Sequence, residues 1–234
     1  MSALEPLAYA DGDLALTGRL ARPAGAPRAG IVVFPSVWGH GPHSDDRAAR
    51  LADAGYLALS ADYYGRELAP DEVHEAGAAL RGDVDGFRAR ARAAVSALAS
   101  LPEAAGLPLG AIGFCQGGMA VLDLARMGAP LAAVASFHGL LQTQRPADGP
   151  IKPRILVCHG DADPMVTRDA VMTFWEEMDR AEADWHFHSY SGVVHGFTDP
   201  ASNGRGSPAI RYDASADRQS WAALLAFFGE VFGG

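Results

Sequence analysis

Short apolar runs of strand length alternate along the chain with longer segments that have helical periodicity. The apolar runs lie at residues 31–34, 57–61, 111–114, 131–137 and 155–158. Runs of this kind are typical of strands buried on both faces of a parallel sheet. Residues 185–190, WHFHSY, alternate between apolar and polar positions instead. This alternation indicates a strand nearer the edge of the sheet.

Helical patterns fall between these runs. Apolar side chains recur at helical spacing from Val84 to Leu98 and from Trp221 to Phe232. At the start of the chain, residues 6–10 and 14–21 flank an Asp-Gly pair, which is a strong signal for an antiparallel hairpin. The pattern as a whole predicts an α/β fold: a mostly parallel central sheet with helices on both faces and an N-terminal antiparallel hairpin.

Composition narrows the class of protein. The 234 residues, 49% of them hydrophobic and 20% charged, favour a soluble globular protein with a single domain over residues 1–234. A net charge of −9 argues against nucleic acid or an anionic membrane as the main partner. Two cysteines do not make a disulfide framework, and from the sequence pattern we expect neither a signal peptide nor a bilayer-spanning helix. We therefore expect a cytoplasmic protein.

Three chemically distinctive stretches come directly after predicted strands. They are GFCQGG at 113–118, HGDADP at 159–164 and SGVVHGF at 191–197. In open α/β sheets the active site forms at the carboxyl ends of the strands. The sequence therefore predicts that these three stretches contribute to one site.

Cys115 lies in the pattern Gly113-x-Cys115-x-Gly117, between an apolar strand and a helical segment. This context is typical of a nucleophile elbow, a sharp strand-to-helix turn whose neighbours must be small. The helix N-terminus would favour a thiolate there. The alternative is a buried structural cysteine, but the glycine frame favours the nucleophile. Cys158 has no such frame and is expected in the core.

A cysteine nucleophile needs a base and a group that orients the base. The chain order Cys115, Asp163, His195 matches the order nucleophile, acid, histidine of α/β-hydrolases. Asp161 is instead expected to cap its own turn. A metal site through His159, Asp161 and Asp163 is the less favoured alternative, since no further ligand spacing supports it.

Together these stretches resemble the dienelactone hydrolase family, which has the α/β-hydrolase fold. GFCQGG is similar to the family's cysteine elbow, HGDADPMV to its acid loop and VVHGF to its histidine loop. IVVF followed by PSVWG resembles the oxyanion-loop segment, and ADYYGR resembles a segment that carries a carboxylate-binding arginine. The resemblance extends over nearly the whole chain.

The resemblance implies a role for individual residues. Cys115 would be the nucleophile, His195 the base and Asp163 its orienting acid, with the backbone N–H groups of Val37 and Gln116 as the oxyanion hole. Substrate-binding positions would be Ser36, Trp38, Tyr64 and Arg66, although Arg66 is equally compatible with a solvated loop arginine. No metal and no organic cofactor are implied.

Two positions depart from the family pattern. Ser36 stands where dienelactone hydrolases have a glutamate that takes part in activating the thiol, and a serine cannot act as a carboxylate base. Asp199 stands where they have a second carboxylate-binding arginine, a role that Arg205 or Arg211 would have to fill. Both departures bear on the substrate and leave the three candidate catalytic residues unchanged.

We therefore expect a cysteine-dependent hydrolase of small esters or lactones that works through an acyl-thioester, as a monomer or a small homo-oligomer. One alternative is a glutamine-amidotransferase-like enzyme that uses His159 and Asp161, but it leaves Asp163 and His195 without a role. The other is a non-hydrolytic protein of the same fold that binds a small ligand or senses oxidants through Cys115.

Overall fold

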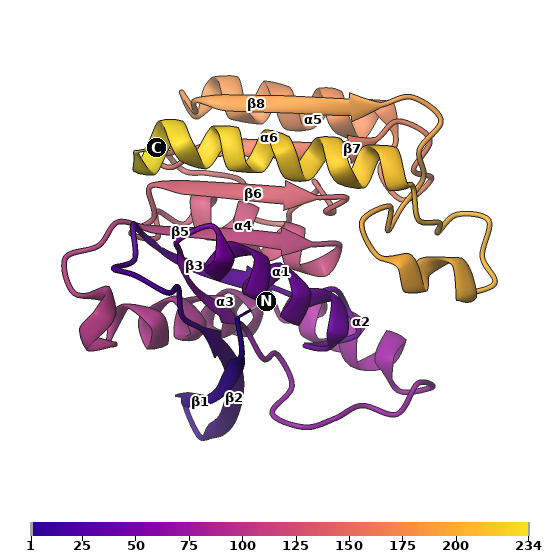
Figure 1. Ribbon diagram of the computed structural model, residues 1–234. Coiled ribbons are helices and arrows are strands. Elements are labelled where there is room, and N and C mark those ends of the chain that lie inside the picture. Colours follow the sequence, from indigo (N-terminus) through magenta and orange to yellow (C-terminus); the bar gives the residue numbers. More distant parts are fainter. Residues whose placement is uncertain (1, 234) are drawn as a thin grey trace. The chain divides into compact units, whose positions relative to one another are not determined.

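The computed structural model describes residues 2–233 and divides into two compact units, residues 1–112 and 113–234. Eight strands and six α-helices alternate along the described chain, and the strands form a mostly parallel sheet (Figure 1). The predicted α/β fold is confirmed, including the antiparallel N-terminal hairpin. Whether residues 1–234 behave as a single domain stays a prediction.

The N-terminal unit contains four complete strands and three α-helices. These are β1 Leu4–Asp11, β2 Leu14–Ala21, β3 Gly30–Phe34, α1 Pro42–Asp53, β4 Leu57–Ser60, α2 Val73–Gly82 and α3 Val84–Ala99, followed by the 3₁₀ helix η1 Pro102–Ala104. β1 and β2 pair antiparallel along their full length, from Leu4 opposite Ala21 to Asp11 opposite Leu14. Gly12, at φ 57°, provides the left-handed residue that the tight turn requires. β3 and β4 pair in parallel.

Helix α3 illustrates why these residues form a helix. The carboxylate of Asp83 accepts a hydrogen bond from the backbone N–H of Gly86 and so caps the first turn. Phe87, Ala91, Val95 and Leu98 are buried on one side, as their spacing predicts. The predicted helix and the observed one begin at the same residue.

The second unit begins at the end of β5 Leu109–Phe114, a strand that spans the boundary. Its elements are α4 Gln116–Arg126, β6 Ala133–Phe137, β7 Arg154–Gly160, α5 Arg168–Arg180, β8 Trp185–Tyr190, the 3₁₀ helix η2 Pro200–Gly204 and α6 Ala214–Phe232. β6, β7 and β8 are parallel, and α6 lies on one face of them with α4 and α5 on the other (Figure 1). β8 ends the strand order, as its alternating sequence predicts.

A buried ionic cluster joins the two helices α4 and α5. The guanidinium of Arg126 donates two hydrogen bonds to Glu177, at 2.9 and 2.7 Å, and one to Asp123 at 3.2 Å. It also donates to the carbonyl oxygen of Leu141 at 2.8 Å. Nothing in the sequence pattern distinguished this arginine from a solvated one.

Predicted and observed strands differ mainly at their ends. β7 continues two residues beyond the predicted 155–158 because His159 and Gly160 still pair with β8. At Gly160 a Cβ atom would collide with the carbonyl oxygen of Val193, so only glycine allows this close approach of two backbones. The helices α1, α2 and α5 have no counterpart among the predicted elements.

Candidate active site

Cys115 is the single residue between β5 and α4. Its backbone has φ 55° and ψ −114°, in a region that is strained for any residue with a side chain. A Cβ atom at Gly113 would collide with the carbonyl oxygen of Gly117, which explains the glycine before the turn. The N–H of Cys115 donates to the carbonyl oxygen of Phe137 at 3.0 Å and ties the turn to β6. The strand–turn–helix geometry is the one the sequence predicts.

The position of Cys115 has chemical consequences. Its side chain is partly exposed, while Gln116 behind it is fully buried. The first N–H groups of a helix have no acceptor within the helix, and they carry the positive end of its dipole. Gln116 is the first residue of α4, so its N–H belongs to this set. A negative sulfur or oxygen atom at this turn is therefore favoured.

The acid loop follows β7. Asp163 is buried, and its Oδ1 accepts a hydrogen bond from the backbone N–H of Met165 at 2.9 Å. The expectation that Asp161 caps this turn is wrong: its carboxylate accepts two hydrogen bonds from the exposed side chain of Arg168, at 2.9 and 2.6 Å. The reason is that Arg168 opens α5 within reach of Asp161, while Asp163 points inward.

His195 lies in the loop after β8, and the following chain segment holds its backbone. Its N–H donates to the carbonyl oxygen of Ala209 at 3.1 Å, and its own carbonyl oxygen accepts from the N–H of Arg211 at 3.0 Å. Its imidazole is buried, and Nδ1 lies 2.7 Å from Oδ2 of Asp163. The structure thus brings together two of the predicted residues that are 32 positions apart.

Both Asp163 and Cys115 affect the pKa of His195. Burial lowers the pKa of His195, but the hydrogen bond to Asp163 and then the nearby thiol of Cys115 outweigh it and raise this pKa to about 10. Nε2 of His195 is buried and makes no hydrogen bond of normal geometry within residues 2–233. A carboxylate therefore lies behind the imidazole ring, which is the arrangement in which a histidine can accept and return a proton.

Two of the buried residues in this unit, Cys158 and His138, bear on the site. Burial raises the pKa of the Cys158 thiol to about 12, so this cysteine is a core residue, as predicted. His138, directly after β6, packs its ring against that of His195. The sequence pattern did not single out His138 as a functional residue. Its position at the carboxyl end of a parallel strand was the signal that would have singled it out.

The oxyanion-hole candidate Val37 and the substrate-binding candidates Ser36, Trp38 and Tyr64 lie in the N-terminal unit. The hydroxyl of Tyr64 donates to the carbonyl oxygen of Val37 at 2.9 Å, and the N–H of Trp38 points to Oγ of Ser36 at 3.4 Å. The N–H of Gly39 donates to the carbonyl oxygen of Ser36 at 3.0 Å. The peptide groups on both sides of Val37 are therefore held by hydrogen bonds within this unit.

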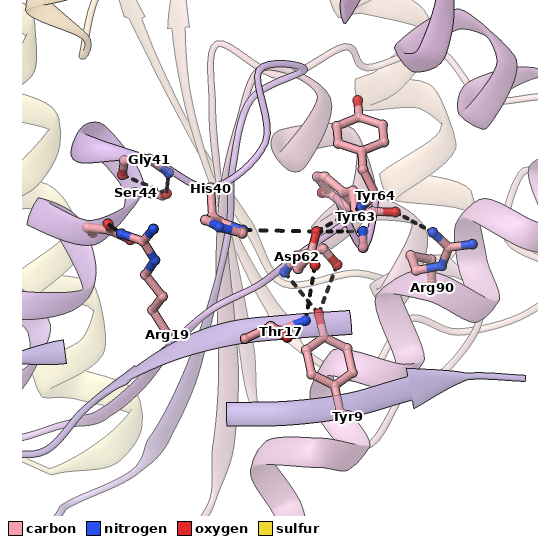
Figure 2. A network of polar contacts seen from close by, with 12 residues as sticks. Tyr9, Thr17, Arg19, His40, Gly41, Ser44, Asp62, Tyr63, Tyr64 and Arg90 are labelled. Atoms are coloured by element: carbon pink, nitrogen blue, oxygen red, sulfur yellow. Dashed lines mark hydrogen bonds and ion pairs between the residues drawn. The ribbon is translucent and has the colours of Figure 1, made fainter. Parts of the chain in front are cut away.

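The buried carboxylate of Asp62 holds the backbone of Tyr64, the residue whose hydroxyl contacts Val37. Figure 2 shows Asp62 at the centre of a polar network, where it accepts hydrogen bonds from the N–H groups of Thr17, Tyr64 and Gly65 at 3.0, 2.8 and 3.1 Å. Tyr9 bonds both the carbonyl oxygen and the N–H of Asp62 through its hydroxyl group. The sequence pattern gave no sign of this network.

Arg66 is exposed and forms two hydrogen bonds with the carboxylate of Glu72, at 3.0 and 3.1 Å. Asp199 caps η2 through the N–H of Ala201 at 2.9 Å and also accepts from Arg205 at 3.3 Å. Both arginines are thus engaged by carboxylates of the chain itself. Their role toward a substrate stays a prediction.

Other kinds of site have little support in the described part of the chain. Residues 2–233 contain no group of three His, Cys, Asp or Glu side chains arranged to hold a metal ion. Within the same range, every helix is too short or too polar to cross a membrane. The predicted cytoplasmic location is tested by neither observation.

The fold and the arrangement around the elbow define an α/β-hydrolase. The model of the dienelactone hydrolase family matches residues 16–232. The chain belongs to the dienelactone hydrolase family, and it is a carboxylic ester hydrolase, as the sequence resemblance implied.

Three relatives illustrate the range of similarity. The chain is 42% identical over 152 residues to an uncharacterized protein of Caenorhabditis elegans, covering 62% of this chain and 94% of that one. It is 29% identical over 192 residues to a protein of Bradyrhizobium sp named "Probable 2-oxo-3-(5-oxofuran-2-ylidene)propanoate lactonase", covering 76% and 77% of the two chains. A solved structure described as a dienelactone hydrolase-like promiscuous phosphotriesterase from metagenomic libraries is 36% identical, with a TM-score of 0.91 over 98% of both chains.

Proposed function

We propose that this protein hydrolyses small carboxylic esters or lactones through a Cys115–His195–Asp163 triad and an acyl-thioester intermediate. The observation that carries the proposal is the 2.7 Å contact between Nδ1 of His195 and Asp163, in a unit where the thiol of Cys115 also influences the titration of His195. The strained turn at a helix N-terminus supports a reactive thiol.

In the proposed reaction the thiolate of Cys115 attacks the carbonyl carbon, and the carbonyl π electrons move to oxygen. The N–H of Gln116 donates to this oxyanion, a contribution of roughly 3–4 kcal/mol for one such donor. A second donor, the N–H of Val37, is implied by the family resemblance. Protonated His195 then gives its proton to the departing alkoxide, which leaves an acyl group on sulfur.

Deacylation reverses the roles. Neutral His195 takes a proton from water as the water attacks the thioester carbon. The C–S bond breaks, sulfur leaves as thiolate and His195 is again protonated beside it. For a lactone the leaving alkoxide stays attached to the acyl group, so one molecule with a carboxylate and a hydroxyl or keto group is released. Ser36 takes no proton in this scheme, and a small-molecule substrate is the only partner that it requires.

The alternative of a thiol sensor has a specific weakness. A sensor of this kind keeps a second cysteine within reach to resolve the oxidised form. Cys158 is fully buried, and burial raises the pKa of its thiol to about 12. It is therefore a poor resolving thiol, and hydrolysis is the better account of Cys115.

The test compares wild type, Cys115→Ala and Cys158→Ala in hydrolysis of p-nitrophenyl acetate, before and after iodoacetamide treatment at pH 8. We expect alkylation of native protein only at Cys115, with loss of activity there and in Cys115→Ala. Cys158→Ala is the matched control and should retain activity. Activity in Cys115→Ala equal to wild type, or an inactive wild type, would reject the proposal.

Hydrolysis of phosphotriesters is a second candidate activity. It is supported by the 36% identity to the promiscuous phosphotriesterase. The same thiolate would attack phosphorus and expel an aryl oxide, after which water must break the P–S bond. With paraoxon, we expect steady release of p-nitrophenol by wild type and Cys158→Ala and none by Cys115→Ala. Release that stops at one equivalent would mean that the phosphorylated thiol is not hydrolysed.

A further inference from the structure

The buried His138 beside the candidate site has no part in the proposed reaction. It follows β6 directly and adopts φ 40°, in the left-handed region. Such a conformation is strained in a residue other than glycine, and it persists where the surroundings hold it. Its N–H donates to the carbonyl oxygen of Cys158 at 2.8 Å, which fixes the backbone next to β7.

The side chain of His138 is held by the loop that carries His195. Its ring centroid lies 5.1 Å from that of His195 at an interplanar angle of 68°, and 5.2 Å from that of Phe197 at 77°. Its Nε2 lies 2.9 Å from Oγ1 of the buried Thr198. Three residues of one short loop therefore contact this ring, and one of them is the candidate base.

The ring contact between His138 and His195 can fix the plane of the His195 imidazole. The hydrogen bond to Asp163 fixes the position of one ring nitrogen, but the ring can still turn about that bond. A second contact on the face or edge of the ring is required to fix its plane, and a T-shaped pair of rings does this with a favourable interaction.

We propose that His138 is a positioning residue for His195: its ring, tethered to Thr198, holds the imidazole plane so that Nε2 is presented to Cys115. The inference rests on the proposed function for its catalytic consequence. The ionisable groups that face His195 are Asp163, Cys115, His159 and His138 itself. His138 is the one whose ring the structure places in a T-shaped contact with it.

The experiment compares His138→Asn and Thr198→Val with wild type. Asparagine tolerates the left-handed backbone but removes the ring, and valine removes only the hydroxyl. His188→Asn, on the exposed side of β8, is the matched control. We measure kcat and KM for p-nitrophenyl acetate, the Tm, and the rate of Cys115 alkylation by iodoacetamide from pH 5 to 10.

We expect kcat of His138→Asn to fall about 10- to 100-fold, as for a misplaced catalytic group, with KM within twofold. The alkylation rate should reach half its maximum at a higher pH, because a misaligned imidazolium stabilises the thiolate less. Thr198→Val should move both quantities in the same direction by less, and His188→Asn should move neither.

Two results would overturn the inference. One is an alkylation profile of His138→Asn that superimposes on that of wild type while kcat stays within twofold. The other is a lower Tm that is accompanied by unchanged kcat and alkylation in the folded protein, which means a structural role alone. The rate of alkylation depends on Cys115 and His195 and requires no ester. It therefore distinguishes a failure of this inference from a failure of the proposed ester hydrolysis.

Discussion

Replacing Asp163 by asparagine isolates the carboxylate behind His195. Oδ1 of Asp163 accepts from the N–H of Met165, and Oδ2 contacts Nδ1 of His195 at 2.7 Å, with both residues buried. Asparagine keeps the size but offers one oxygen and one NH₂ group. If the amide oxygen keeps the hydrogen bond from the N–H of Met165, the NH₂ group donates to Nδ1 of His195. The proton of the imidazole ring is then on Nε2, the nitrogen that must accept the proton of the thiol.

The magnitude follows from the pKa of His195. The ordinary value of 6.5 is raised to about 10 against the effect of burial, chiefly by Asp163 and then by Cys115. This difference corresponds to roughly 5 kcal/mol in favour of the charged ring. A single charge-assisted hydrogen bond contributes about 1.5–3 kcal/mol of that. Added loss from the wrong tautomer brings the expected decrease in kcat/KM to about 10²- to 10⁴-fold.

The assay is kcat/KM for p-nitrophenyl acetate from pH 5 to 11, with Asp161→Asn as the matched control. Without Asp163, the pKa of His195 falls, so the imidazolium is lost at a lower pH. The alkaline limb of the profile should therefore move to lower pH in Asp163→Asn. The partly exposed Asp161 contacts Arg168, so its variant should stay within twofold of wild type. An Asp163→Asn profile within threefold of wild type, with its alkaline limb unmoved, would refute the reasoning.

Three further predictions concern stability. Gly113→Ala should lower the unfolding free energy by about 1–3 kcal/mol by overpacking, seen as a lower Tm, while Gly149→Ala, where a Cβ meets no atom within 4 Å, should not. Arg126→Met should cost about 3–5 kcal/mol in urea unfolding because it leaves the carboxylate of Glu177 buried and uncompensated; a cost below 1 kcal/mol would contradict this. Because its folded-state pKa is raised, His195 stabilises the fold fully below pH 6.5 and progressively less up to about pH 10. The Tm gap between wild type and His195→Gln should shrink over that range, and a gap that widens would count against the assigned pKa.

Most of the strand pattern could be predicted from the sequence because it depends on local periodicity. The alternating run 185–190 became the edge strand β8, and the continuous runs became buried strands. The elbow could also be predicted, since Gly113 and Gly117 lie two positions from Cys115, and a Cβ atom at Gly113 would collide with the backbone of Gly117. Family membership followed from the order of three such local stretches.

The side-chain contacts around the site were decided by the tertiary structure. The sequence favoured Asp163 over Asp161 as the acid, but the contact of Asp161 with Arg168 appears only in the fold, which turns Asp163 toward His195. The bond from His138 to Thr198 spans 60 positions. Local spacing carries no information about such contacts.

The chain by itself therefore determined the periodic elements, the glycine frame and the order of the chemical groups, because steric and hydrophobic preferences act over a few residues. The tertiary structure decided that Asp161 pairs with Arg168, that His138 lies against the ring of His195, and that Arg126 is buried rather than solvated. The physical reason is that hydrogen bonds and ring contacts depend on distances of a few ångströms, which are set only when distant segments pack together.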